Sequence, residues 1–430
     1  MTIESRRQFL RKLGAGAAAL GAGAFFSPVS AREIVQDLKV FTGKASEIAK
    51  NEDYWARVQQ AFTVDRSLVN LNNGGVSPSP AYVQEAMKQH LDYSNKAPVY
   101  TMWRILEPQR EGVRQRLAKA LGVDMEEIAI TRNASESLQI CQFGFDLEPA
   151  DEVLTTDQDY PRMITTFKQR ERREGIKLKQ FSIPVPAEDD DEIVRLFEEN
   201  ISPKTKLILM CHMINITGQI LPVKKVVNMA RKYDIPVIVD GAHSFAHFDY
   251  SYDDLQCDYY TSSLHKWLFA PFGTGLLYVK KEKIRDLWPL MAAEESKDDD
   301  IRKFEETGTH PAANYLAIGE ALTFHEGIGP KRKEARLKFL NDIWIDELLP
   351  YDRVKLHTSR DSRYACGIAT VQVEGIEPGE LTNRLWKKHR IIVTPIVHPQ
   401  FKGIRITPNV YTTLDEIGRF TEAMRREIVS

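Results

Sequence analysis

The chain has 430 residues and a formal net charge of −2, because 58 lysines and arginines face 60 aspartates and glutamates. Such a balanced charge argues against nucleic acid or an anionic membrane as the main partner. Hydrophobic residues make up 43% and charged residues 27%, which excludes a disordered or fibrous protein and indicates a globular one of two or three domains.

The first 31 residues differ from the rest of the chain. Ser5–Lys12 is basic with paired arginines, Leu13–Phe26 is uncharged and rich in glycine and alanine, and Val29–Ala31 offers small residues for cleavage. This order resembles a twin-arginine (Tat) export signal, read by the Tat machinery. The apolar stretch is short for a bilayer-spanning helix, so we expect a signal over residues 1–31, cleaved after Ala31, rather than a retained anchor. The mature protein is therefore expected to be periplasmic or exported.

Between residues 126 and 280, short apolar segments alternate with amphipathic ones. This alternation predicts a parallel sheet covered by helices on both faces. The expected strands are Ile128–Ile130, Val153–Thr155, Lys179–Ile183, Lys206–Cys211, Ile235–Val239, Tyr259–Ser262 and Gly275–Val279, and the expected helices are Asn133–Phe145, Arg162–Arg173, Asp189–Glu199 and Val223–Lys232.

The last third of the chain has a different pattern. Two segments, Asn314–His325 and Lys331–Leu349, have the apolar spacing of helices. After Pro350, strand-like segments surround one more helix, which predicts a second, smaller α+β unit; they are Gly367–Val373, Ile391–Thr394 and Gly403–Thr407, with the helix at Gly379–His389. We expect an N-terminal segment of the small domain (32–70), a large domain (71–310), connecting helices (311–345) and a small C-terminal domain (346–430).

Asp240 and Lys266 are the strongest chemical candidates. Asp240 ends an apolar strand, and the carboxyl edge of a parallel sheet is where such folds bind ligands, although a helix N-cap would also explain it. Lys266 follows 26 residues later, just after another strand. A desolvated lysine has a lowered pKa, and its neutral amine can form a Schiff base, although a surface lysine is the simpler alternative.

A third element lies at the junction of a strand and a helix, in Thr131–Glu136. Free backbone N–H groups and the Ser135 hydroxyl could hold a phosphate there, or Asn133 could simply cap the helix. A phosphate site, an acid and a lysine in this order are the layout of fold-type I pyridoxal-phosphate (PLP) enzymes. The chain resembles the class V aminotransferase family, and within it the isopenicillin N epimerase-like branch, over about residues 50–425.

The resemblance implies a mostly parallel, seven-stranded sheet sandwiched by helices, with a smaller α+β C-terminal domain. It also implies that PLP binds Lys266 as a Schiff base, that Lys266 moves protons at the substrate Cα, and that Asp240 pairs with the pyridine nitrogen. The remaining cofactor contacts that it implies are His243 and Asn215 at the phenolic oxygen, Ala134, Ser135, Ser263 and His265 at the phosphate, and Tyr160 stacked on the ring.

Three further positions follow from the same resemblance. Thr309 matches a loop that reaches the partner's cofactor phosphate, which implies a homodimer with shared active sites. Arg405 matches the arginine that binds the substrate carboxylate, although a structural ion pair is the alternative. Asn73 matches a loop at the substrate entrance, which a simple turn would explain nearly as well.

The positions of the cysteines reduce the number of reaction types that the protein could catalyse. Cysteine desulfurases of this family use a mobile cysteine shortly before the carboxylate-binding arginine, but 390–404 contains none, and Cys366 lies in an apolar strand pattern typical of a core residue. No CxxC pair is present, so we expect no metal site. A persulfide-forming desulfurase is therefore disfavoured.

The remaining activities are transamination or epimerisation at the Cα of an amino acid, with a C–S or β-elimination lyase as the alternative. A non-catalytic exported binding protein on the same fold is a further alternative, against which Lys266, Asp240 and Arg405 together argue. A nicotinamide oxidoreductase is disfavoured because no GxGxxG follows a strand.

Overall fold

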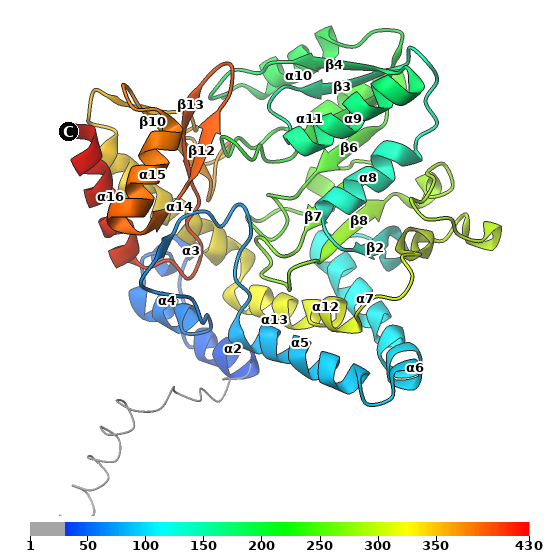
Figure 1. The fold of residues 1–430 in the computed structure, drawn as a ribbon, viewed down its shortest axis with the longest axis horizontal. Helices are drawn as coiled ribbons and strands as arrows, with labels where there is room; N and C mark the ends of the chain where they lie inside the picture. The colour runs from blue at the N-terminus through cyan, green and yellow to red at the C-terminus, as the bar shows by residue number, and fades with distance from the viewer. Residues whose placement is uncertain (1–30, 430) are drawn as a thin grey trace, which may run out of the picture.

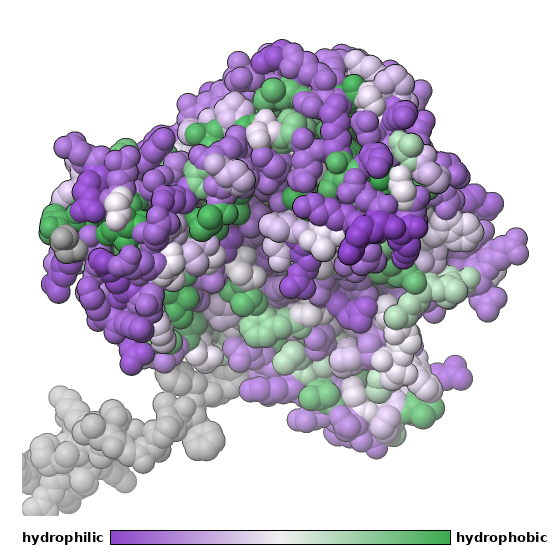
Figure 2. Space-filling model, turned by 45° about the horizontal axis from the view of Figure 1, so that its top comes forward, coloured by the Kyte–Doolittle hydropathy of each residue, from purple (hydrophilic) through white to green (hydrophobic). Residues whose placement is uncertain are grey.

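The computed structural model describes residues 31–429, which form a large sheet layered between helices, with a smaller sheet beside it (Figure 1). The export signal expected over residues 1–31 lies, apart from Ala31, outside these residues. Within residues 31–429 no helix has both the length and the apolarity needed to cross a bilayer. The face seen in Figure 2 is largely hydrophilic, with hydrophobic side chains in small separate groups.

The large sheet has seven strands in the order β2-β8-β7-β6-β5-β3-β4. Only β8 runs against its neighbours within this sheet, which confirms the mostly parallel arrangement predicted from the alternating pattern. The strands are β2 (Ile128–Thr131), β3 (Glu152–Thr156), β4 (Lys177–Phe181), β5 (Thr205–Cys211), β6 (Val237–Asp240), β7 (Tyr259–Ser263) and β8 (Gly275–Val279).

Both faces of this sheet are covered by helices, because its central strands are apolar on both sides. Along β5, Leu207 and Leu209 pack into one hydrophobic cluster, whereas Ile208 and Met210 pack into another on the opposite face. The first cluster includes side chains of α8 (Ala134–Gly144) and α9 (Pro161–Glu174), and the second those of α7 (Arg110–Leu121), α10 (Asp190–Glu199) and α11 (Val223–Ala230).

The smaller sheet has four antiparallel strands in the order β12-β13-β10-β9. The segment 391–394, predicted as one strand, is divided: β11 (Ile391–Ile392) pairs with β1 (Val69–Asn70), and the chain then joins β13 as β12. This unit contains β9 (Val354–Leu356), β10 (Ala369–Val373), β12 (Thr394–Val397), β13 (Lys402–Ile406), α15 (Pro378–His389) and α16 (Leu414–Val429).

The remaining helices join the two sheets. Near the N-terminus, α2 packs on α13 and α4, and α3 packs on α14. The Tyr54 hydroxyl donates to the carbonyl oxygen of Ile328 at 2.9 Å, which ties α4 to the end of α13. These helices are α2 (Ala31–Lys39), α3 (Ala45–Ile48), α4 (Glu52–Gln59), α5 (Ala81–Ser94), α6 (Pro98–Tyr100), α12 (Ala312–Leu316), α13 (Ile318–Ile328) and α14 (Pro330–Leu348).

One glycine fixes the start of α8 against the sheet. Gly275 is the first residue of β8, and a Cβ atom there would lie 2.6 Å from the Asn133 Cα atom and 2.7 Å from the Thr131 Oγ1 atom. The backbones therefore touch at a distance that only glycine permits. As a result, the N-terminus of α8 is held at the carboxyl edge of the parallel strands.

This contact predicts that Gly275→Ala destabilises the protein by about 1–3 kcal/mol, because backbone rather than a flexible side chain must move. The control is Gly418→Ala in α16, where a Cβ atom would meet nothing within 4 Å. That change should be neutral or stabilise by about 0.5–1 kcal/mol. Urea unfolding of both variants checks the prediction, and equal unfolding midpoints would contradict it.

Candidate active site

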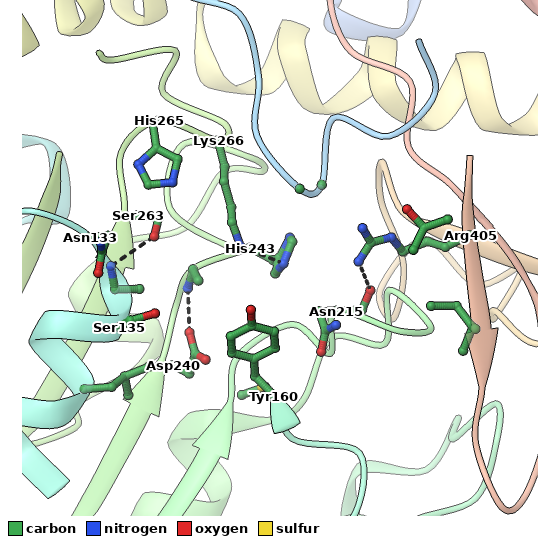
Figure 3. Close-up of a pocket in the computed structure, with 18 residues that line it drawn as sticks. Asn133, Ser135, Tyr160, Asn215, Asp240, His243, Ser263, His265, Lys266 and Arg405 are labelled. Atoms are coloured by element: carbon green, nitrogen blue, oxygen red, sulfur yellow. Dashed lines mark hydrogen bonds between the residues drawn. The ribbon is translucent and has the colours of Figure 1, made fainter. Parts of the chain in front are cut away.

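A cavity of about 380 Å³ lies at the carboxyl edge of the large sheet, where the small sheet approaches it (Figure 3). This volume lies in the range of small-molecule sites, about 300–1,000 Å³. Ten of the residues predicted from the sequence line it, and they come from segments far apart in the chain: Ala134, Ser135, Tyr160, Asn215, Asp240, His243, Ser263, His265, Lys266 and Arg405.

Lys266 and Asp240 have shifted pKa values for the same physical reason. Lys266 follows β7, and its burial lowers its pKa to about 8, although the charge of Asp240 acts in the opposite direction. Asp240 ends β6, and burial raises the pKa of its carboxyl to about 6. A larger fraction of Lys266 than of an ordinary lysine is therefore the neutral, nucleophilic amine near neutral pH.

His243 is the immediate neighbour of the lysine. Its Nε2 atom lies 3.0 Å from the Lys266 Nζ atom. Burial, and then the charge of Lys266, hold the pKa of His243 well below its usual range, so the imidazole is neutral. Close by, the side-chain Oδ1 atom of Asn215 is buried and has no hydrogen bond with any described residue.

The start of α8 forms one end of the cavity. The Asn133 side chain caps the helix by accepting from the Glu136 N–H at 2.9 Å. The N–H of Ala134, a residue that the family resemblance places at the phosphate, donates to the Ser263 Oγ atom at 2.9 Å and so positions that hydroxyl. Because Ser263 accepts there, its own proton is left to donate, and the helix N-terminus favours an anion.

Arg405 lies at the other end of the cavity, on β13. Its Nη1 atom donates to the Asn215 carbonyl oxygen at 2.9 Å, and its Nη2 atom donates to the Asn72 Oδ1 atom at 3.0 Å. Burial lowers the pKa of the guanidinium to about 10, so it stays charged at neutral pH. Both of these hydrogen-bond acceptors are neutral, whereas the structural ion pair considered as the alternative for Arg405 would need an acidic partner.

Tyr160 and Thr309 lie at two different cavities. Tyr160 precedes α9 and rises into the cavity with its hydroxyl toward the space between Lys266 and Arg405 (Figure 3). Thr309 is exposed and lines a separate cavity of about 300 Å³.

Asn73 does not line the main cavity. Its side chain is fully buried, donates to the Thr407 carbonyl oxygen at 2.9 Å and accepts from the Tyr411 hydroxyl at 2.6 Å. The neighbouring Gly74 and Gly75 line the cavity instead. Two residues of this loop thus line the cavity, whereas Asn73 holds the loop in place.

Two site residues were missed by the sequence analysis. Cys211 ends β5 beside Asp240 and lines the cavity, and burial raises the pKa of its thiol well above the usual value. Asp159 is fully buried next to Tyr160, and burial raises the pKa of its carboxyl. Cys211 ends a strand and Asp159 follows one at the carboxyl edge, which is the signal that could have identified them.

The Asp159 carboxylate joins two strand ends. Its Oδ2 atom accepts from the Thr155 hydroxyl at 2.8 Å, and from the Thr156 N–H at 2.9 Å and hydroxyl at 2.7 Å. Its Oδ1 atom accepts from the Cys211 N–H at 2.7 Å. The negative charge of Asp159 also contributes to raising the pKa of Asp240.

These residues fit PLP. An anion-binding helix N-terminus with the Ser263 hydroxyl suits its phosphate, the buried Asp240 carboxylate suits its pyridine nitrogen, and the Lys266 amine suits its aldehyde. The unpartnered Asn215 oxygen and the His243 ring supply polar atoms beside the lysine.

Comparison with known proteins agrees with this geometry. The aminotransferase class-V family matches residues 69–396. The isopenicillin N epimerase of Streptomyces clavuligerus is 27% identical over 387 residues, which cover 86% of this chain and 97% of that protein. The hercynylcysteine sulfoxide lyase of Schizosaccharomyces pombe is 25% identical over 296 residues, which cover 66% and 75%. Cysteine desulfurases are also among the relatives.

The fold has solved counterparts. A structure of a C-DES mutant with glycine covalently linked to the PLP cofactor has a TM-score of 0.74 at 22% identity, covering 83% of this chain and 96% of that one. This likeness confirms the fold-type I architecture, with its large mostly parallel sheet and smaller antiparallel one. The chain belongs to the class V aminotransferase family of PLP-dependent enzymes.

Proposed function

We propose that the protein moves a proton at the Cα atom of an amino acid, as an epimerase or an aminotransferase. The observation that carries this proposal is the placement of two opposite chemical functions in one cavity. Lys266, with its lowered pKa, lies at the cofactor end, and the charged Arg405 lies at the other. An amino acid has a carboxylate for the second and an amine and a Cα proton for the first.

The guanidinium of Arg405 suits a planar carboxylate, which it can bind through two parallel N–H donors. When bound, PLP supplies an electron sink for the charge that develops as the Cα proton leaves. Lys266, once released as a free amine, accepts that proton, because its lowered pKa favours the neutral base.

Of these two outcomes, we propose epimerisation. The proton must return to the opposite face of Cα, and the Tyr160 hydroxyl, which enters the cavity from another element, is a candidate to deliver it. A relative that matches over 97% of its own length is itself an isopenicillin N epimerase. Transamination needs only Lys266 on one face.

Lyase and desulfurase activities are the competing outcomes, since relatives of both kinds are found. A desulfurase needs a thiolate to take up sulfur. Among the described residues, Cys211 is the cysteine that lines the cavity. It ends a buried strand, and burial raises the pKa of its thiol well above the usual value. This supports proton transfer over persulfide formation. A lyase would need no such thiol.

Two further proposals come from the sequence. We infer that the protein is exported through the Tat pathway to the periplasm and cleaved after Ala31, which the N-terminal mass of protein purified from its native host tests. We also infer a homodimer in which Thr309 reaches the partner's site, which sedimentation analysis tests.

Loss of the lysine should abolish turnover. Lys266→Ala is expected to slow exchange of the Cα proton with deuterated water by about 10²–10⁴-fold or more, because a positioned general base contributes this order. The control is Lys331→Ala, which removes a lysine with a side chain 80% exposed. Nuclear magnetic resonance of a panel of L-amino acids measures the exchange, and undiminished exchange in Lys266→Ala would refute the assignment.

The same panel separates the reaction types. A D-enantiomer indicates epimerisation, and a 2-oxo acid formed with an amino-group acceptor indicates transamination. Pyruvate with ammonia or a sulfur product indicates a lyase. After borohydride reduction, peptide mass mapping should find the cofactor on Lys266.

Arg405→Gln should raise KM for amino acids at least about tenfold, because the paired hydrogen bonds to the carboxylate are charge-assisted. The matched substrate is the corresponding amino-acid amide, which lacks the carboxylate charge. The KM for this amide should change much less between the wild-type protein and Arg405→Gln. Equal losses for both substrates would show that Arg405 does not read the carboxylate.

The Lys266 amine of the full-length apoprotein should titrate near pH 8, as its pKa indicates. Asp240 is ionised at that pH and favours the ammonium form, so Asp240→Asn should lower the midpoint further. Trace acetylation with acetic anhydride, which modifies only neutral amines, measures this when the acetylated peptide is quantified by mass spectrometry. A midpoint that rises in Asp240→Asn would contradict the electrostatic account.

A further inference from the structure

A fully buried tryptophan follows the catalytic lysine and contacts its histidine neighbour. The Trp267 Nε1 atom donates to the His243 Nδ1 atom at 3.4 Å. An indole N–H can only donate, so His243 Nδ1 must present its lone pair. A neutral imidazole carries a single proton, which is therefore on Nε2.

This proton faces the lysine, because Nε2 lies 3.0 Å from the Lys266 Nζ atom. A neutral amine has a lone pair and can accept from Nε2–H. An ammonium group has three protons and no lone pair, so it would meet the N–H without an acceptor. The indole of Trp267 thus determines that His243 can form a hydrogen bond with the neutral amine of Lys266 and not with its ammonium form.

The tryptophan is itself held from two sides. Its indole stacks on the His247 ring, with the centroids 3.5 Å apart and the planes 14° apart. Its carbonyl oxygen accepts from the Nζ atom of Lys333, a fully buried lysine on α14. The ring is therefore fixed in the orientation that points its N–H at His243.

His247 is fixed by two backbone groups, one of which accepts a hydrogen bond while the other donates one. Its Nδ1 atom lies 2.7 Å from the His243 carbonyl oxygen, which can only accept, so Nδ1 carries the proton. Its Nε2 atom accepts from the Gly367 N–H at 2.9 Å. Both contacts are satisfied by the neutral ring, and burial holds the pKa of His247 well below its usual range.

We propose that Trp267 and His247 are positioning residues that keep the His243 proton on Nε2 and thereby stabilise Lys266 as a neutral amine. The inference deepens the proposed function, because it rests on Lys266 as the reactive amine.

The charged and titratable groups around the lysine act separately from this hydrogen bond. Asp240 and Cys211 favour the ammonium form of Lys266, and Arg405 disfavours it. Burial, and after it the charge of Lys266, lowers the pKa of His265 and of His243. Around His247, the charges of Lys333 and Lys338 both favour the neutral ring.

Trp267→Phe tests the proposal, because it keeps a ring beside His247 and removes the N–H donor. His243 is then free to place its proton on Nδ1 and accept from the ammonium form. Below the wild-type midpoint, trace acetylation of Lys266 in the full-length apoprotein should fall about tenfold, since a hydrogen bond to a charged group shifts an equilibrium by at least this order.

The matched control is Trp344→Phe, which removes another fully buried indole whose N–H donates to the Asn341 Oδ1 atom at 3.0 Å. It should leave acetylation of Lys266 unchanged. In a His243→Gln background, Trp267→Phe should have no further effect. An unchanged profile in folded Trp267→Phe, or an equal shift in the control, would overturn the proposal. Circular dichroism and gel filtration establish that each apoprotein is folded.

A second measurement needs no tryptophan variant. Nitrogen nuclear magnetic resonance of histidine-labelled wild-type protein, with the His243 signals identified by their loss in His243→Gln, should show a protonated Nε2 and a bare Nδ1. The opposite pattern would overturn the proposal even if Trp267→Phe does not fold. Failure of the proposed function would instead appear as absent Cα exchange in the holoenzyme, with this labelling profile intact.

Discussion

The active site depends on a carboxylate that touches no ligand position: Asp159, buried where two parallel strands end. Its four hydrogen bonds to the ends of β3 and β5 compensate the burial of the carboxylate, which would otherwise cost several kcal/mol. They also fix the spacing between the Tyr160 segment and the strand beside Asp240. The same carboxylate adds its negative charge to the burial that raises the pKa of Asp240.

The site is composite, and each sheet contributes a different kind of group. The large sheet supplies the buried acid and the lysine, and Gly275 at its edge holds the start of α8 beside them. The small sheet supplies Arg405, whose guanidinium is held by Asn72 and by the Asn215 carbonyl oxygen. The lysine and the arginine therefore reach one cavity from elements that belong to separate hydrophobic cores.

The sequence was sufficient to predict what is local or periodic. Alternating apolar segments predicted the parallel sheet, and the order of Ser135, Asp240 and Lys266 along the chain supported the family resemblance from which the chemistry was predicted. Contacts between distant segments could not be predicted in this way: Asn73 bonds to Thr407 and Tyr411, more than 300 residues away, and Cys211 reaches the cavity only because β5 lies beside β6. The division of 391–394 into two strands likewise depends on pairing partners, not on local pattern.

Besides Arg405, the segment that leads into the small sheet makes a second contact near the active site, through Gly367. Its N–H reaches the His247 ring, and its missing side chain is necessary, since a Cβ atom would lie 2.7 Å from the Nε2 atom of that ring. Gly367 leads into β10, the strand that pairs with the one carrying Arg405. A substitution that shifts the start of β10 is therefore expected to disturb two places at once, the guanidinium of Arg405 through β13 and the ring of His247 through this hydrogen bond.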